Sequence, residues 1–293
     1  MTMAKCIDAH HHCWRMARGD YGWLKAASPE LAPLRRDFEP TQFEPLRAQF
    51  GVGQTVVVQA APTTAETDHL LALAARSPWI AGVVGWVDLA DDASIPTLER
   101  WATNPVFKGV RPMLQDLPDS RWIATAPQPR VVDALERLGL RLDALVRPQH
   151  LPALKEFARR HPRLPIVIDH GAKPPMRAGE LQLYWRTHIA ALACQPQVYC
   201  KVSGLLTETH HRGVTLDQQL DAVRPVWDHL LRCFGPSRLI WGSDWPVLSL
   251  AADYGRWVAV CEQLFADLPD ADQARVWWRN AAEFYRLPME REA

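Results

Sequence analysis

The sequence predicts a single α/β domain folded as a distorted (β/α)8 TIM barrel. Three observations support this fold class: eight short apolar runs alternate with helix-length segments, the 293 residues approach the roughly 250 typical of the barrel, and no Gly- or Ser-rich linker divides the chain. One domain is therefore expected over residues 1–293. A doubly wound open sheet is the main alternative, but its first strand usually leads into a glycine-rich phosphate-binding turn, and here that turn is rich in histidine.

The expected strands are short runs of apolar, often β-branched residues near 6–10, 55–60, 82–87, 106–111, 141–146, 165–169, 198–203 and 238–242. Apolar residues at helical spacing predict helices over 69–74, 131–138, 151–160 and 216–231. Residues 13–50 form a long connection after the first strand and contain several aromatic residues and prolines. Because long ordered insertions at the C-terminal face of a barrel usually shape the pocket, we expect this segment to lie near it. An outer loop packed by its own aromatic residues is the alternative.

The composition narrows the classes of ligand and location. The chain holds 33 basic and 33 acidic residues, so no overall charge attracts nucleic acid or an anionic membrane, and a small neutral or weakly charged ligand is expected. No apolar stretch approaches the roughly 20 residues of a membrane span, and the first residues do not resemble a signal peptide. The six cysteines form no C-x-x-C pair, which favours reduced thiols and a cytoplasmic location. A homo-oligomer remains possible.

The first apolar run, IDAHHHCW, carries three consecutive histidines. If it is a strand, His10 and His12 point to one face and His11 to the other. A chance cluster or the scar of an affinity tag is the alternative. Two later runs also lead from apolar residues into His or Asp followed by Gly or Pro, at His170 and Asp244. The C-terminal ends of barrel strands converge, so these four side chains are expected to meet over the barrel mouth.

Three imidazoles and a carboxylate match a site for a single Zn²⁺ ion. The chemistry that follows is hydrolysis, in which the metal or the imidazoles of His10, His12 and His170 polarise a carbonyl group and Asp244 takes a proton from the attacking water. Each histidine could instead be a hydrogen-bonded loop residue, so the prediction depends on all four residues together.

Further candidates lie at or just after strand ends. Arg111 could hold a substrate oxygen through its fixed fork of donors, or form a structural ion pair. Lys108 could be a second electrophile, a carbamoylated bridge between two metals, or an ordinary loop lysine. Aromatic walls with a few polar groups suit a sugar-like ligand, and the candidates for these walls are Trp14, Trp23, Gln59, Trp86 and Trp245. No role is assigned to Cys13, His150, His210 or His211.

Several of these motifs together resemble the amidohydrolase superfamily, and within it the sugar lactonases that act on L-fuconolactone and L-rhamnonolactone. They are IDAHHHCW, ARGDYGWL, FKGVRP, DHGAKP, KVSGL, GSDWPV and NAAEFYRL, and they span essentially the whole chain. The resemblance implies a distorted barrel that hydrolyses an aldono-1,4- or 1,5-lactone to its acid. It also implies that His10 and His12 are the strand-one pair, that His170 is the strand-six histidine, and that Asp244 is the general base.

The chain departs from the two-metal members of that superfamily. Lys108 stands near the fourth strand's end, and strand five is followed by Arg147 and His150 rather than by an immediate histidine ligand. We therefore expect one Zn²⁺ ion, which activity does not strictly require. Two alternative functions stay open: a metal-dependent decarboxylase acting on an aromatic acid, and a non-catalytic sugar-binding protein. A neutral lactone is favoured over a dicarboxylate because no cluster of arginines accompanies Arg111.

Overall fold

The computed structural model describes residues 6–25, 28–176, 179–209 and 214–288. Within them, eight parallel strands form one sheet in sequence order from β1 to β8. The strands are β1 (Cys6–His11), β2 (Val52–Val58), β3 (Ile80–Gly85), β4 (Phe107–Val110), β5 (Arg141–Ala144), β6 (Ile166–Ile168), β7 (Val198–Val202) and β8 (Leu239–Trp241). Each coincides with one of the eight predicted runs. The predicted (β/α)8 barrel is therefore confirmed.

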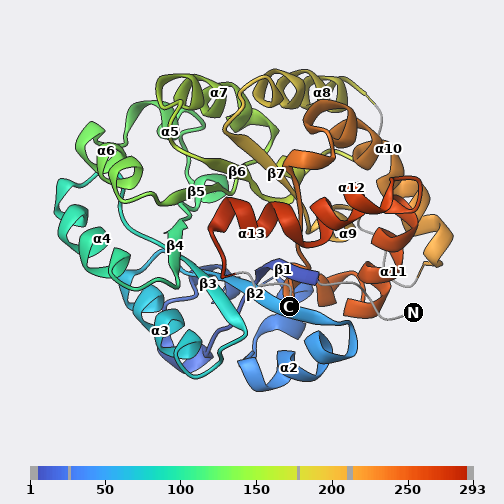
Figure 1. Cartoon of the computed structure of the whole chain (residues 1–293), viewed down its shortest axis with the longest axis horizontal. Helices are drawn as coiled ribbons and strands as arrows, with labels where there is room; N and C mark the ends of the chain where they lie inside the picture. The colour runs from blue at the N-terminus through green and yellow to red at the C-terminus, as the bar shows by residue number, and fades with distance from the viewer. Residues whose placement is uncertain (1–5, 26–27, 177–178, 210–213, 289–293) are drawn as a thin grey trace.

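Helices surround this sheet, and most of them lie on its outer face (Figure 1). They are α1 (Gly22–Lys25), α2 (Pro40–Gln49), α3 (Thr64–Ala74), α4 (Ile95–Ala102), α5 (Trp122–Thr125), α6 (Pro129–Arg137), α7 (Leu151–Arg160), α8 (Glu180–Ala193), α9 (Leu205–Glu208), α10 (Leu216–Phe234), α11 (Tyr254–Phe265), α12 (Asp270–Ala274) and α13 (Asn280–Tyr285). The four predicted helical segments correspond to α3, α6, α7 and α10. In the described part of the chain, no helix is both long and apolar enough to cross a membrane.

Strand alternation divides the core into two parts. Val57 belongs to the core between strands and outer helices, whereas Val56 and Val58 belong to a smaller core inside the barrel. Helix α13 lies across one end of the barrel in Figure 1 and adds Phe284 and Tyr285 to this inner core. That end is therefore filled with side chains, and the opposite end, where the strands terminate, is left for the site.

The barrel closes through the segment that follows β8. The backbone N–H of Asp244 donates to the carbonyl of His10 at 2.7 Å, and the N–H of His12 donates to the carbonyl of Trp245, also at 2.7 Å. Ser243 is fixed in addition, because its N–H donates to Asp8 Oδ1 at 2.9 Å. The hydrogen bonds that close the sheet thus place Asp244 beside His10 and His12.

The connection over residues 13–50 is ordered by its own aromatic side chains. Trp14 and Phe38 exchange both backbone hydrogen bonds, at 2.8 and 2.9 Å. The Trp14 ring also packs edge-on against Trp23, with centroids 5.6 Å apart. Trp23 and Leu31 from the same segment line the pocket described below. Both interpretations offered by the sequence thus apply to this segment: Trp14 and Phe38 pack the loop, and Trp23 and Leu31 form part of the pocket wall.

Candidate active site

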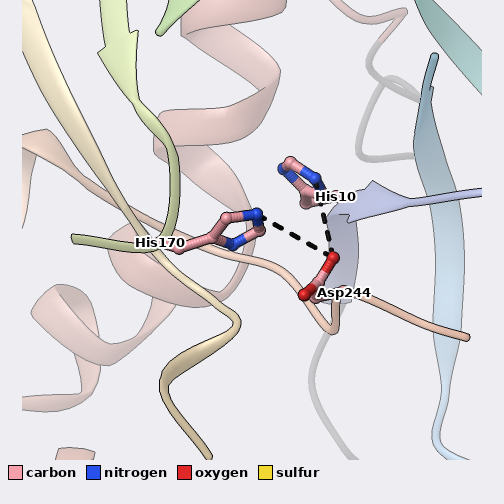
Figure 2. A group of neighbouring side chains, drawn as sticks. All are labelled: His10, His170 and Asp244. Atoms are coloured by element: carbon pink, nitrogen blue, oxygen red, sulfur yellow. Dashed lines mark ion pairs between the residues drawn. The ribbon is translucent and has the colours of Figure 1, made fainter. Parts of the chain in front are cut away.

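His10, His12, His170 and Asp244 meet at the C-terminal ends of β1, β6 and β8. Asp244 Oδ1 lies 3.3 Å from His12 Nε2, 3.8 Å from His10 Nε2 and 3.9 Å from His170 Nε2. Figure 2 shows the rings of His10 and His170 facing the Asp244 carboxylate. All four residues are buried, with at most 4% of their surface exposed. The structure thus brings together the four residues predicted from sequence.

The middle histidine of the run points away from this cluster. His11 Nε2 lies 2.9 Å from Thr55 Oγ1, and its ring stacks on Phe43 with centroids 4.6 Å apart. This is the alternation expected of a strand. His11 therefore anchors the outer face of β1, while its neighbours serve the site.

His170 and Asp244 both have left-handed backbone conformations, with φ of 53° and 60°. Such angles are uncommon outside glycine, and residues that hold them cluster at functional sites. His170 is held further by a contact of 2.9 Å between its Nδ1 and Ser203 Oγ. Gly204, directly after Ser203, approaches so closely that a Cβ there would lie 2.6 Å from His170 Nδ1 and 3.1 Å from Asp244 Oδ2. The site needs glycine at this position.

A fully buried lysine lies behind the histidines. Lys201 Nζ is 2.6 Å from Asp143 Oδ2, 3.1 Å from Asp169 Oδ1 and 3.1 Å from His10 Nδ1. The contacts to Asp143 and His10 have hydrogen-bond geometry, and the contact to Asp169 is an ion pair. Tyr285 of α13 donates to the same Asp143 oxygen at 2.8 Å. This cluster of Lys201, Asp143, Asp169 and Tyr285, here named the buried lysine cluster, supports His10 from below.

These surroundings keep His10 and His170 neutral and the Asp244 carboxylate ionised. Burial and the charge of Lys201 hold the pKa of His10 well below its ordinary value. Burial lowers the pKa of His170 to about 4, although the nearby Asp244 opposes the shift. Burial alone raises the pKa of Asp244, but the neighbouring imidazoles, His170 foremost, outweigh it and lower this pKa. At neutral pH, His10 and His170 are therefore uncharged and Asp244 is ionised.

This donor set fits one divalent metal ion. His10, His170 and Asp244 each offer a ligand atom, and the three atoms lie within 4.8 Å of one another. His12 Nδ1 lies 2.8 Å from the carbonyl of Val58, which can only accept, so its ring proton is on Nδ1 and the Nε2 lone pair faces Asp244. Two acceptors that face each other require a proton or a cation between them. Neutral imidazole and ionised carboxylate are also the forms that bind metals.

A cavity of about 360 Å³ opens above this cluster, and His12, His170, Asp244 and Arg111 form its floor. Its other charged residues are Glu30, Arg147, Lys173 and Glu208. Basic and acidic groups are thus equal in number, and Lys173 pairs with Glu208 at 3.7 Å. A neutral ligand suits a pocket with this balance.

Arg111 and Trp23 line the pocket, as predicted for substrate-binding residues. Gln59 lies beneath Arg111 instead. The side-chain Nε2 of Gln59 donates to the backbone carbonyl of Arg111 at 2.7 Å, and the backbone carbonyl of Gln59 accepts from Arg111 Nη2. Arg111 Nη1 is also 3.5 Å from Asp169 Oδ2. Gln59 and Asp169 therefore orient the guanidinium, and the structural ion pair considered for Arg111 coexists with its position in the pocket.

Two tryptophans predicted to bind the substrate, Trp14 and Trp245, lie elsewhere. Trp14 is completely buried and donates from Nε1 to the carbonyl of Arg36 at 2.8 Å. Trp245 packs on Phe43, with centroids 4.9 Å apart. Both tryptophans belong to the aromatic core that fixes the first connection, so the structure does not support their prediction as pocket walls.

Lys108 is the second residue of β4, three residues before Arg111, and its Nζ donates to the carbonyl of Arg286 at 3.1 Å. Arg286 directly follows α13, so Lys108 faces the filled end of the barrel. The interpretations of Lys108 as an electrophile or as a metal bridge are therefore wrong. Trp86 lines a second cavity next to the pocket.

Several residues of the site were not predicted. Met113, Gln115, Arg147, Lys173 and Glu208 reach the pocket from loops whose course the sequence does not reveal. The sequence does contain a signal for Asp169 and Lys201, because each is a charged residue within or next to an apolar strand. Cys13 is buried in the core, and His150 Nδ1 accepts from the N–H of Arg147 at 3.0 Å, at the start of α7. His210 and His211 lie outside the described residues.

Comparison with known proteins agrees with this site. The sequence pattern of the Amidohydrolase family matches residues 7–287. The chain belongs to the amidohydrolase family. This amidohydrolase is 48% identical over 286 residues to an L-fucono-1,5-lactonase of Burkholderia ambifaria, covering 96% of the chain and 95% of that relative. It is 35% identical to an L-fucono-1,5-lactonase of Burkholderia multivorans, with 98% of both proteins covered.

A solved structure of a Burkholderia multivorans amidohydrolase with bound zinc superposes on this amidohydrolase with a TM-score of 0.89 and 34% identity. The match covers 97% of this chain and 100% of the other. A divalent metal in this amidohydrolase is thus supported both by the zinc of that neighbour and by the donor set described above.

Proposed function

We propose that the protein hydrolyses a sugar lactone, such as L-fucono-1,5-lactone or a closely similar aldonolactone, to the sugar acid. The observation that carries this proposal is the ionised Asp244, which lies beside the neutral His10 and His170 and lines a charge-balanced pocket. The L-fucono-1,5-lactonases to which the chain is similar support the same class of substrate.

In this mechanism, Asp244 removes a proton from a water molecule as the water oxygen attacks the lactone carbonyl carbon. The carbonyl oxygen gains negative charge, which Arg111 and His170 on the pocket floor are placed to stabilise through N–H donors. The tetrahedral centre then collapses, the bond to the ring oxygen breaks, and that oxygen receives the proton held by Asp244. Water is consumed, and the product is a hydroxy acid that releases a proton at neutral pH.

His10, His12, His170 and Asp244 are the residues that would hold a zinc ion. A bound zinc ion would supply a Lewis acid next to the substrate carbonyl. A lactone is already an activated ester, so we propose that hydrolysis also proceeds without the metal, with Arg111 and the histidines polarising the carbonyl.

The six cysteines are free thiols, in keeping with a proposed cytoplasmic location.

The test follows proton release with a pH indicator when chelated and zinc-loaded samples receive a panel of aldono-1,4- and 1,5-lactones. Hydrolysis in both samples, abolished in Asp244→Asn, is the expected result. Hydrolysis in the zinc-loaded sample alone would refute metal-independent activity but keep the lactonase. No hydrolysis in either sample would refute the function, and carbon dioxide release from an aromatic acid would then assign the protein as a decarboxylase.

A further inference from the structure

A second cavity lies beside the active-site pocket, and the mechanism above does not use it. Its volume is about 670 Å³, within the roughly 300–1,000 Å³ typical of ligand sites. It is bounded by the segments that follow β1, β2, β3 and β4, so it opens on the same end of the barrel as the active site. Trp23 and Met113 line both cavities and form the wall between them.

The lining combines flat aromatic faces with oxygen acceptors. The indole rings are those of Trp23, Trp86 and Trp122, all of them partly exposed. Trp23 is held rigidly, because its Nε1 donates to the carbonyl of Ala60 at 2.9 Å and its ring packs against Trp14. Rigid aromatic faces bind ligands at a low entropic cost.

Carboxylates supply the polar contacts. Asp88 Oδ1 accepts the N–H of Ala90 at 2.9 Å, and Asp116 Oδ2 accepts from Gln115 Nε2 at 3.4 Å. A carboxylate has about four acceptor positions, so each keeps free lone pairs. Among the described residues, neither aspartate forms an ion pair within 4.0 Å, and no Lys, Arg or His lines this cavity. An anionic ligand is therefore disfavoured.

We propose that this cavity is a subsite for a neutral sugar ring joined by a glycosidic bond to the lactone. The C–H faces of such a ring stack on indoles and its hydroxyl groups donate to carboxylates, whereas a bare apolar ligand would leave Asp88 and Asp116 unused. The shared wall of Trp23 and Met113 places the two rings of one ligand in adjoining cavities. Only the lactone C–O bond is hydrolysed, and the glycosidic bond stays intact. This inference rests on the proposed lactonase function.

The experiment compares the best monosaccharide lactone from the panel above with derivatives that carry a neutral hexopyranosyl unit on each free hydroxyl in turn. At least one derivative is expected to exceed the parent lactone in kcat/KM by about three- to tenfold, the gain of one aromatic stacking contact. Trp122→Ala and Asp88→Asn should remove that gain and leave hydrolysis of the parent unchanged. Tyr184→Ala, which changes an exposed aromatic residue on α8 that lines neither cavity, should keep the gain.

Two results would overturn the subsite. One is hydrolysis of the parent lactone with no derivative surpassing it. The other is a gain that survives in both Trp122→Ala and Asp88→Asn. Competitive inhibition by a quaternary ammonium ion, with no gain from any sugar unit, would assign the cavity to a cation instead. If the wild type does not hydrolyse the parent lactone at all, the lactonase function itself is refuted, and this outcome is distinguishable from failure of the subsite alone.

Discussion

Replacing Gly204 with alanine tests whether close packing around His170 sets the rate. Gly204 has a φ of +61°, and an alanine Cβ would lie 2.6 Å from His170 Nδ1, whereas ordinary contact begins at 3.4 Å. The imidazole must therefore retreat by about 0.8 Å, or Ser203 and Gly204 must move together. A displacement of about 1 Å in a catalytic group can cost on the order of 10²-fold in rate. We expect Gly204→Ala to lower kcat/KM for the lactone by about 10²-fold.

The matched control is Gly19→Ala. Gly19 is also left-handed, with a φ of +78°, but a Cβ there would meet nothing within 4 Å. Both variants incur the left-handed penalty of roughly 1–2 kcal/mol, so both should melt a few degrees below the wild type. Initial-rate kinetics and thermal melts on the two proteins separate the causes. Wild-type kcat/KM in a folded Gly204→Ala protein would refute the reasoning, as would an equal loss of activity in Gly19→Ala.

Three further predictions concern the carboxylate, the buried cation and pH. Asp244→Asn should fold normally and lose about 10²- to 10⁴-fold in kcat, and a turnover near that of the wild type would exclude Asp244 as the base. Lys201→Met leaves Asp143 without a cation and Asp169 with Arg111 alone, and it should destabilise the fold by about 3–5 kcal/mol in denaturant titrations. Asp143→Asn should be milder because Lys201 keeps Asp169. In chelated protein, the pKa of His170 is about 4 in the folded state and about 6.5 in the unfolded state. Between these values the unfolded chain binds a proton that the folded chain does not, so the free energy of unfolding should fall as pH drops from 6.5 towards 4. His170→Gln should flatten this dependence, and an unchanged slope would show that other groups cause it.

Strand positions and the histidine cluster could be predicted because both follow from local rules. Alternation along β1 requires only the knowledge that His10 and His12 lie on a strand, and barrel topology then brings β6 and β8 beside it. The identity of the pocket walls does not follow in this way. Trp14 and Trp23 belong to the same segment, yet one is completely buried and the other lines both cavities. An indole suits either environment, so its residue type alone cannot decide.

The error on Lys108 has a different origin. A strand of four residues such as β4 offers only a short apolar run, so its end could not be located to within two residues from the sequence. Only two residues separate Arg111, at the mouth of the barrel, from Lys108, which contacts Arg286 at the filled end. Lys201 presented the opposite problem. A lysine within an apolar strand signals a buried charge, but its partners Asp143 and Asp169 lie on other strands and only the folded barrel identifies them.

The contact between Tyr285 and Asp143 has a consequence for biosynthesis. His10 is among the first residues to be synthesised. The buried lysine cluster next to it is completed by the hydroxyl group of Tyr285 on α13, about 275 residues later in the chain. During translation, a chain that has emerged only through Asp244 holds every proposed catalytic side chain but lacks the tyrosine that donates to Asp143. A nascent barrel of that length could close its sheet and still leave Lys201 and His10 incompletely held. Activity should therefore appear only after α13 has left the exit tunnel.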